Sequence, residues 1–529
     1  MAAVGNLFVA QSLDTVVKDD EYNAMSTFRD KTIKGIGWSV VSQIGQQAIS
    51  FIIIIILARL LSPREFGLLA MITVITSFAS IFVEMGFSAA LVQKHDIRQA
   101  HLSSVFWLNL VVGLGFTLAF VAVAPIISRF YSEPLLIPLT MFIAANFLLG
   151  SLTIVQKTMM TKALDFRRLA IVDIVAVAFS GGFAIVLAYA GFGVWSLAVQ
   201  TVFLSAITTV MLWKLGKWRP SFVFDWTAIK DLLGFSSNLF GSTLLNYWVR
   251  NLDYLLIGRF IGTQSLGIYK NAYSIMLFPL NNISRVISRV MFPSLSLIQH
   301  DKAKVRSVYL LATRAIALVT FPLMTGLFVV VESFVLTLFG SQWSGMIPIL
   351  RVFCLTGLLQ SVATLTGNLY LSQGKADLQF RVGLFVHANA IICIVVGLRW
   401  GVLGVAIGYT IATMINSFPS LFFAGRLVDL TFWQVWSKLL GIIGCALIMA
   451  IAVWGIGLAL PALWPPWLCL VTQIAFGVLF YGVLIHFLAV QAYVETRELL
   501  SEQVRHKFWS KEDTLTAIPI VPGVPEDSR

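Results

Sequence analysis

The chain has 529 residues, of which 58% are hydrophobic and 12% are charged, and its mean hydropathy is +0.87. A soluble globular protein is closer to half apolar with about a quarter of its residues charged, so this composition excludes a soluble protein and predicts one that crosses a membrane many times. The net charge of +12 lies mostly beside apolar segments, which favours membrane orientation over nucleic-acid binding.

Fourteen apolar segments follow one another along the chain, each near or above the length of about 20 residues that a helix needs to cross a bilayer. Because the backbone in lipid must satisfy its own hydrogen bonds, each segment is predicted to be a helix. The fold class is therefore all-α integral membrane, with 14 transmembrane helices. The expected spans are residues 35–61, 66–92, 104–127, 134–156, 169–190, 193–213, 232–258, 264–292, 307–331, 345–372, 380–398, 401–425, 437–458 and 467–489.

Lysine and arginine are unevenly distributed between the connections. The even-numbered connections hold 15 of them and the odd-numbered connections hold 5, counted from the sequence. Cytoplasmic connections carry the excess of basic residues, so both termini are expected in the cytoplasm.

The longest polar interruption, Trp213–Asp231, predicts a boundary after six spans. A shift of 200 residues places Arg59 on Arg259 and Gly67 on Gly267, as in a parallel repeat about an axis normal to the membrane. The expected divisions are a cytoplasmic tail (1–33), an N-lobe (34–215), a cytoplasmic linker (216–231), a C-lobe (232–425), two further spans (426–489) and a cytoplasmic C-terminal tail (490–529).

Charged residues inside spans are costly and usually face a cavity. Most of them here are basic and belong to the C-lobe, which predicts a cationic chamber for an anionic ligand, since arginine matches phosphate oxygens. Snorkelling to the interface is the alternative for Arg289 and Arg381. The candidates for substrate binding among the basic residues are Arg250, Lys270, Arg314, Arg351 and Arg285.

Polar stripes on the first and seventh spans add Gln43, Gln46, Gln47 and Asn246 to the candidate substrate-binding residues. Hydrogen bonding between helices is the alternative interpretation of the glutamines. Asp253 lies one turn from Arg250 and is expected to pair with it, while Glu84 is the acidic candidate of the N-lobe. Asp253 and Glu84 are the candidates for ion coupling, although Glu84 is equally compatible with a hydrogen bond between helices.

Several chemistries are not expected. Neither Gly216–Lys217 nor Gly374–Lys375 is followed by Ser or Thr, so there is no Walker A loop. The four cysteines show no CxxC spacing, which argues against a disulfide framework or a metal site. The sequence supports no catalytic residue, no enzyme class and no cofactor.

Two motifs near the start carry a resemblance: AlaArgLeuLeuSerProArgGluPheGlyLeuLeuAla (58–70) and GluMetGlyPheSerAlaAlaLeuValGln (84–93). With PheGlySerGlnTrpSerGlyMetIleProIleLeuArg (339–351), AsnLeuTyrLeuSerGlnGlyLys (368–375) and GlyValLeuGlyValAlaIleGly (401–408), they follow the order found in Wzx-type polysaccharide flippases. The chain resembles the colanic-acid-exporter-like branch of this family, within the multidrug/oligosaccharidyl-lipid/polysaccharide exporter superfamily, over about residues 30–430.

The resemblance implies two six-helix lobes in a V around a central cavity, as in MATE transporters, with two extra helices outside. It implies a bacterial inner-membrane flippase that moves undecaprenyl-diphosphate-linked oligosaccharide by alternating access for exopolysaccharide, capsule or O-antigen export. The expected partners are this lipid-linked anionic oligosaccharide and membrane lipids, with the polysaccharide polymerase or export machinery as further candidates.

Three alternatives remain. A multidrug/cation antiporter of the same superfamily would need acidic residues in its chamber, whereas the deep charges here are mainly basic. A peptidoglycan-precursor flippase would also bind a diphosphate sugar. A membrane glycosyltransferase or polymerase would need a large loop with paired carboxylates, and no connection has room for one.

Overall fold

The computed structural model describes residues 19–94, 96–461, 463–488 and 493–494, and all regular secondary structure within these ranges is helical. The first part of the chain forms α2 (Asp19–Leu60), α3 (Pro63–Glu84), α4 (Phe87–Gln93), α5 (Gln99–Tyr131), α6 (Leu136–Ile143), α7 (Ala145–Lys162), α8 (Phe166–Tyr189) and α9 (Val194–Leu215). The second part forms α10 (Trp226–Phe260), α11 (Thr263–Leu297), α12 (Lys302–Leu338), η1 (Ser341–Trp343), α13 (Met346–Ala363), α14 (Thr366–Ser372), α15 (Ala376–Gly397), η2 (Leu398–Trp400), α16 (Gly401–Arg426), α17 (Phe432–Ser437), α18 (Leu440–Ala459) and α19 (Pro466–Phe487).

Eleven helical segments of the described residues are long and apolar enough to cross a membrane, and one of them, 376–426, contains both α15 and α16. Helices α10 and α11 are not among the eleven, because polar and charged residues interrupt their apolar sequence. Both are nevertheless 35 residues long and pack along α3. The expectation of a multi-pass, all-helical membrane protein is confirmed, and the number of fourteen spans remains a prediction.

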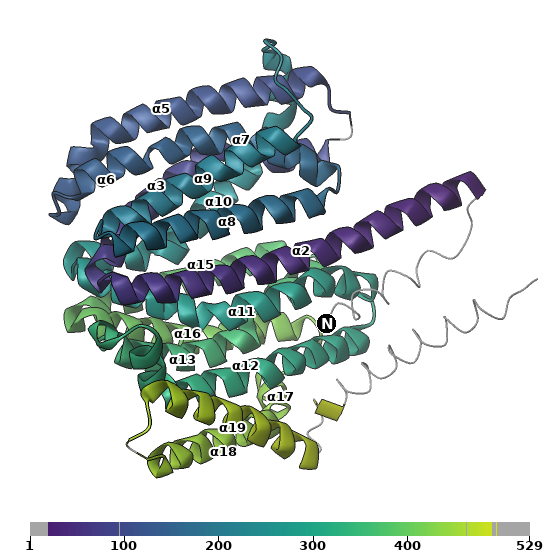
Figure 1. Cartoon of the computed structure of the whole chain (residues 1–529). Helices are drawn as coiled ribbons and strands as arrows, with labels where there is room; N and C mark the ends of the chain where they lie inside the picture. The colour runs from purple at the N-terminus through teal and green to yellow at the C-terminus, as the bar shows by residue number, and fades with distance from the viewer. Residues whose placement is uncertain (1–18, 95, 462, 489–492, 495–529) are drawn as a thin grey trace, which may run out of the picture.

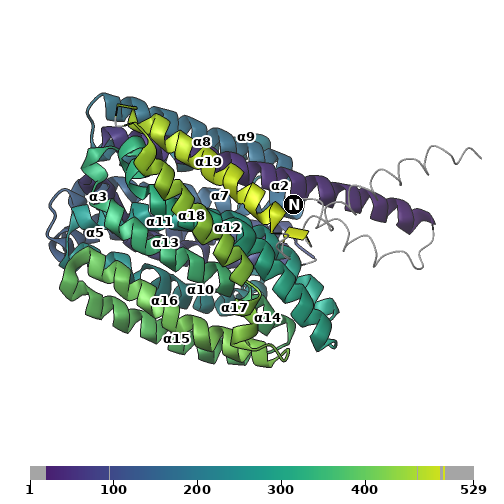
Figure 2. The same ribbon diagram turned by 90° about the horizontal axis from the view of Figure 1, so that it is seen from below.

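The helices form two groups on either side of the long helix α2 (Figure 1). Helices α3 to α9 lie on one side, and α11 to α16 lie on the other. Helices α18 and α19 are outermost in the second group, where they pack against α12 (Figures 1 and 2). Helix α10 contacts α3, α4 and α5 as well as α11 and α15, so it belongs to both groups.

Local sequence explains where several helices begin. Pro63 opens α3, and the Glu65 carboxylate accepts hydrogen bonds from the Ser62 backbone N–H (2.6 Å) and hydroxyl (3.0 Å), which occupies a donor at the helix start. Asp225 caps α10 by accepting from the Thr227 backbone N–H at 2.9 Å. Hydrogen bonds from Thr227 keep the pKa of Asp225 below its usual value.

Three boundaries differ from the expected ones. Helix α2 begins at Asp19, inside the predicted tail 1–33. The second span breaks at Met85 and Gly86, which both adopt positive φ (47° and 73°), so α3 and α4 are separate helices. The connection before α10 covers only 216–225, because Asp225 starts the helix six residues before the predicted end of the linker.

The largest hydrophobic cluster contains residues from both parts of the chain, including Leu57 and Met71 from the first and Leu266, Tyr269 and Trp343 from the second. A separate cluster packs Ile229 and Leu232 at the start of α10 against Phe87 and Leu102. The two groups of helices therefore share one core near Met71, while the first turns of α10 pack within the first group.

Candidate functional site

The second group contains a buried polar network centred on Asp253. This aspartate of α10 is 5% exposed, and its carboxylate accepts hydrogen bonds from the Tyr269 hydroxyl (3.0 Å) and the Tyr254 backbone N–H (2.9 Å). In the part of the chain that the structure describes, no ion pair joins Asp253 to Arg250. The expected pairing is therefore corrected: the partner from another helix is Tyr269, on α11.

Tyrosines extend this polar region across further helices. Tyr273, one turn after Tyr269, lies 3.1 Å from the Tyr409 hydroxyl of α16, which also accepts from Gln360 Nε2 of α13 at 2.9 Å. Four helices, α10, α11, α13 and α16, thus supply one cluster of hydroxyl, amide and carboxylate groups. The sequence analysis missed these tyrosines, because a neutral ring interrupts a hydrophobic span far less than a charge does.

The basic candidates are spread along the second group. Arg250 is exposed and interacts electrostatically with Tyr409 and with His387 of α15. Lys270 is half-buried. Arg314 is 7% exposed, and its Nε donates to the Leu310 carbonyl at 3.3 Å. Arg351 is exposed, 3.6 Å from Glu332 of α12; Glu332 was not among the sequence candidates.

The rise per residue of an α-helix gives the distance of each basic residue from one end of the bundle. The start of α11 and the end of α12 lie at the same end of the bundle, because Gly67 contacts the one and Arg59 the other. At 1.5 Å per residue, Lys270 lies roughly 10 Å from that end, and Arg250 lies roughly 15 Å before the end of α10. Arg314 lies roughly 36 Å from the end of α12. Arg250 and Lys270 are therefore at similar depth, and Arg314 belongs to the opposite half.

The remaining candidates fall in two classes. Gln43, Gln46 and Gln47 are half-buried on α2, and Gln46 Nε2 lies 3.4 Å from the Ser42 hydroxyl, within its own helix. The side chains of Asn246 and Arg285 lie outside the residues whose side chains the structure describes.

Glu84 is exposed and lines a cavity of about 720 Å³ within the first group. The other lining residues come from α3, α4 and α7, and they include Asn146, Thr153 and Lys157.

At one end, hereafter the sealed end, the two groups are in tight contact. A Cβ on Gly67 would lie 1.8 Å from the Thr263 carbonyl oxygen, and one on Gly267 would lie 1.9 Å from that of Pro63. Only glycine fits at such a crossing. The two glycines that the 200-residue shift aligned therefore meet at the contact between α3 and α11.

Side chains reinforce the sealed end. Glu133 accepts from Arg64 at 3.1 Å and from the Thr263 hydroxyl at 2.7 Å, so it joins α3 to α11. Trp343 is fully buried and donates to the Ala58 carbonyl at 2.8 Å, which attaches η1 to α2. The bundle is consequently closed at this end.

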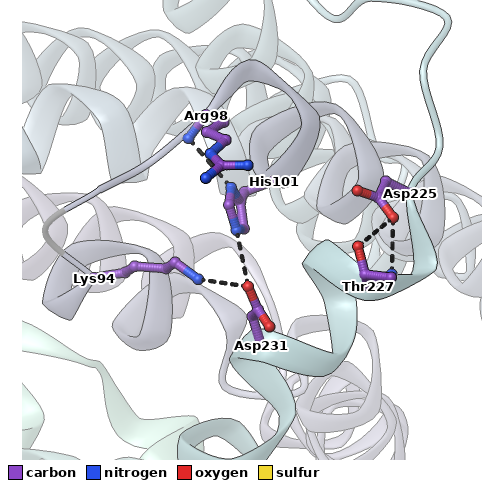
Figure 3. A network of polar contacts seen from close by, with 6 residues as sticks. All are labelled: Lys94, Arg98, His101, Asp225, Thr227 and Asp231. Atoms are coloured by element: carbon purple, nitrogen blue, oxygen red, sulfur yellow. Dashed lines mark hydrogen bonds and ion pairs between the residues drawn. The ribbon is translucent and has the colours of Figure 1, made fainter.

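A different polar network lies at the opposite end (Figure 3). Lys94 Nζ lies 3.0 Å from the Asp231 carboxylate of α10, and His101 Nε2 lies 3.5 Å from it. The Arg98 backbone N–H donates to His101 Nδ1 at 3.2 Å and orients the ring. This network, called the Asp231 latch below, ties the start of α10 to the first group.

The fold is shared with solved membrane transport proteins. The solved structure of the Lipid II flippase MurJ in an inward closed conformation matches with a TM-score of 0.69 at 16% identity, covering 88% of this chain and 100% of that one. A MATE family multidrug resistance transporter of the MOP superfamily matches with 0.58 in its inward-facing conformation and 0.50 in its outward-facing conformation, at 16% and 15% identity. The match to the inward-facing structure covers 72% of this chain and 94% of that one, and the match to the outward-facing structure covers 75% of this chain and 96% of that one. The chain has the fold of these transporters.

Sequence comparison identifies the family. A model described as polysaccharide biosynthesis protein matches residues 56–348, more than half of the chain. The Teichuronic acid biosynthesis protein TuaB of Bacillus subtilis is 32% identical over 359 residues, 67% of this chain and 74% of that one. The Lipopolysaccharide biosynthesis protein WzxC of Escherichia coli is 28% identical over 403 residues, 75% and 81% of the two chains. This chain belongs to the polysaccharide biosynthesis protein family and, as the sequence motifs indicated, to its Wzx-type members.

Proposed function

We propose that this protein is a flippase, not an enzyme, that moves an undecaprenyl-diphosphate-linked oligosaccharide across the bacterial inner membrane during surface polysaccharide export. The observation that carries the proposal is the asymmetry of the bundle. One end is sealed by the Gly67–Gly267 crossing, whereas a cavity in the first group, lined by both polar and apolar side chains, lies toward the other end. Alternating access requires one side to be closed while the substrate site faces the other.

The topology belongs to this proposal. Counting α10, α11, α15 and α16 as single spans gives fourteen, with two lobes of six in a V and α18 and α19 outside. The excess of basic residues in the even-numbered connections supports cytoplasmic termini and, with them, a periplasmic sealed end. The higher TM-score of the inward-facing than of the outward-facing multidrug transporter, 0.58 against 0.50, supports this orientation.

Two regions suit the two ends of the lipid. Arg250 and Lys270 lie at similar depth beside the Asp253–tyrosine network, and we assign the diphosphate to them, because arginine binds phosphate oxygens in a bidentate manner. An apolar groove of about 520 Å³ between α11, α12 and α19, with Phe278, Leu323 and Val478 in its lining, suits a polyprenyl chain. Arg314 and Arg351 are assigned lesser roles, since one lies deep in the other half and the other contacts Glu332.

Gene deletion tests the function. Cells without this protein should accumulate the lipid-linked oligosaccharide and lose the surface polysaccharide, and restoring the gene should reverse both effects. Normal export in the deletion strain, with no accumulated intermediate, would contradict the proposal.

A peptidoglycan-precursor flippase is the second candidate, because MurJ matches over its whole length. Replacing an essential precursor flippase with this protein separates the two functions. Growth of the replaced strain would favour the second candidate, and failure to grow, together with restored polysaccharide export in the deletion strain, would favour the first.

Ion coupling is proposed at Asp253. Asp253→Asn keeps an acceptor for the Tyr269 hydroxyl, so folding and lipid binding should persist, but a residue that cannot ionise should stop net transport in vesicles. Transport by the Asn variant that still responds to an imposed pH gradient would make Asp253 structural, with Glu84 the next residue to test.

A further inference from the structure

The cavity in the first group has the chemistry of a carbohydrate site. Its volume of about 720 Å³ is within the range of small-molecule sites, which is roughly 300–1,000 Å³. The lining residues from Asn146 to Thr161 of α7 extend over roughly 22 Å of helix. The space is therefore elongated, and several sugar rings in a row could occupy it.

Hydroxyl and amide groups line this cavity from two sides. Ser80 and Ser88 come from α3 and α4, while Asn146, Thr153 and Thr158 come from α7. The Oδ1 atom of Asn146 is buried, with no hydrogen-bond partner within the described residues. The Ser80, Thr153 and Thr158 hydroxyls donate to carbonyls of their own helices, so they offer acceptors to the hydroxyls of a sugar, whereas the Asn146 amide and the Ser88 hydroxyl can both donate and accept.

Two opposite charges line the cavity without meeting. Glu84 comes from the end of α3 and Lys157 from α7, and both side chains are exposed. Neither forms an ion pair with the other or with any group of the described chain. Opposite charges that remain apart leave room between them for a polar, uncharged group that can hydrogen-bond to both.

The backbone is irregular at the same place. Met85 and Gly86 break the helix directly after Glu84, both with positive φ. The break therefore marks the point where the cavity lining passes from α3 to α4, next to Glu84.

We propose that the cavity between α3, α4 and α7 is the carbohydrate subsite, in which Glu84 and Lys157 bind sugar hydroxyls of the oligosaccharide. This assignment rests on the proposed flippase function and places the glycan in the first group, apart from the diphosphate. The glutamines of α2, which the sequence analysis named as candidate substrate-binding residues, are not part of the lining of this cavity.

A cavity-filling substitution tests the subsite. A Cβ on Gly150 meets nothing within 4 Å, and Gly150 lines the cavity, so the side chain of Gly150→Phe starts in open space and should occupy part of the cavity. Gly182→Phe is the matched control, because Gly182 is equally open but lies on α8, outside the cavity. Glu84→Gln, which removes a charge at nearly constant volume, is the second variant.

Each full-length variant is titrated in nanodiscs with two lipids: undecaprenyl diphosphate, and the lipid-linked oligosaccharide that accumulates in the deletion strain. In wild type and Gly182→Phe, the oligosaccharide lipid should bind at least about tenfold more tightly, the equivalent of one or two hydrogen bonds. In Gly150→Phe this ratio should fall to about one with diphosphate binding unchanged, and Glu84→Gln should reduce it partly.

The outcomes separate the subsite from the function. An undiminished ratio in Gly150→Phe, or a ratio of about one in wild type while both lipids bind, would overturn the subsite and leave the flippase proposal standing. A wild-type protein that binds neither lipid would overturn both.

Discussion

The carboxylate of Asp253 depends on a neighbouring helix for its hydrogen bonding. Its side chain is 5% exposed, and it accepts a hydrogen bond of 3.0 Å from the Tyr269 hydroxyl of α11. Its other donor is the backbone N–H of the neighbouring residue Tyr254. Sequence reasoning found Asp253, since a carboxylate in an apolar span is conspicuous. It could not find Tyr269, because which neutral side chain meets a buried acid depends on how α10 and α11 pack.

Tyr269→Phe should destabilise the protein. Removing the hydroxyl leaves a buried acceptor without this donor, which costs about 1–3 kcal/mol. The measurement is thermal unfolding of the purified protein in detergent. Tyr189→Phe is the matched control, because Tyr189 is 78% exposed; equal melting temperatures for the two variants would show that the Asp253–Tyr269 hydrogen bond contributes little.

At the scale of helices, the crossing of α3 and α11 was partly predictable. The 200-residue shift aligned Gly67 with Gly267, but only the structure shows that each glycine contacts the other helix. The break at Met85–Gly86 was not predicted, because hydropathy continues through it. The helices α10 and α11 were predicted as spans because the apolar segments 232–258 and 264–292 exceed the length needed to cross a bilayer.

Gly67→Ala should hold the sealed end open. The added methyl would lie 1.8 Å from the Thr263 carbonyl oxygen, a backbone atom that cannot move alone. Overpacking of this kind costs about 1–3 kcal/mol, which shifts the equilibrium between closed and open ends by roughly 5- to 150-fold.

The readout is labelling of a cysteine at Ser265, in the first turn of α11 at the sealed end, by an impermeant reagent, in a background without the four native cysteines. Labelling should increase in Gly67→Ala, and transport should fall at least about tenfold. Gly115→Ala is the control, because its Cβ would meet nothing within 4 Å. Equal labelling in both variants would show that the crossing does not control access.

The stability of the Asp231 latch should depend on pH. The hydrogen bond and charge of Lys94 hold the pKa of Asp231 below its ordinary value, with His101 adding to the effect. Because the folded pKa is depressed, the stabilisation is present above the ordinary aspartate pKa and is lost only as the pH falls through the lower, folded value.

Asp231→Asn should reproduce the acid state at neutral pH. Crosslinking between cysteines at Gln93 and Lys230, which leaves Lys94, His101 and Asp231 in place, should decrease in this variant at neutral pH, and without the substitution only at strongly acid pH. Asp429→Asn, at another exposed ion pair, is the control. If acid but not Asp231→Asn weakened the crosslink, the latch would not depend on this carboxylate.

For the whole molecule, the distribution of basic residues gives a direction across the membrane. Ser132 lies at the sealed end, where it is 3.5 Å from Arg259, and Gln299 lies at the other end, after α11. Single cysteines at these two sites should react differently in intact cells. An impermeant reagent should label the cysteine at 132 and not the one at 299, because the sealed end faces outward; the reverse pattern would contradict the orientation.

The pairing of α3 with α10 and α11 also has a consequence for biogenesis. An arginine, lysine or aspartate at the centre of a helix costs about 2.5–3.5 kcal/mol on insertion, and α10 carries Arg250 and Asp253 while α11 carries Lys270. Neither helix is apolar enough to enter the bilayer readily by itself. Both pack along α3, which the ribosome completes earlier, so we expect the first half of the protein to assist insertion of α10 and α11 by offering them a packing surface.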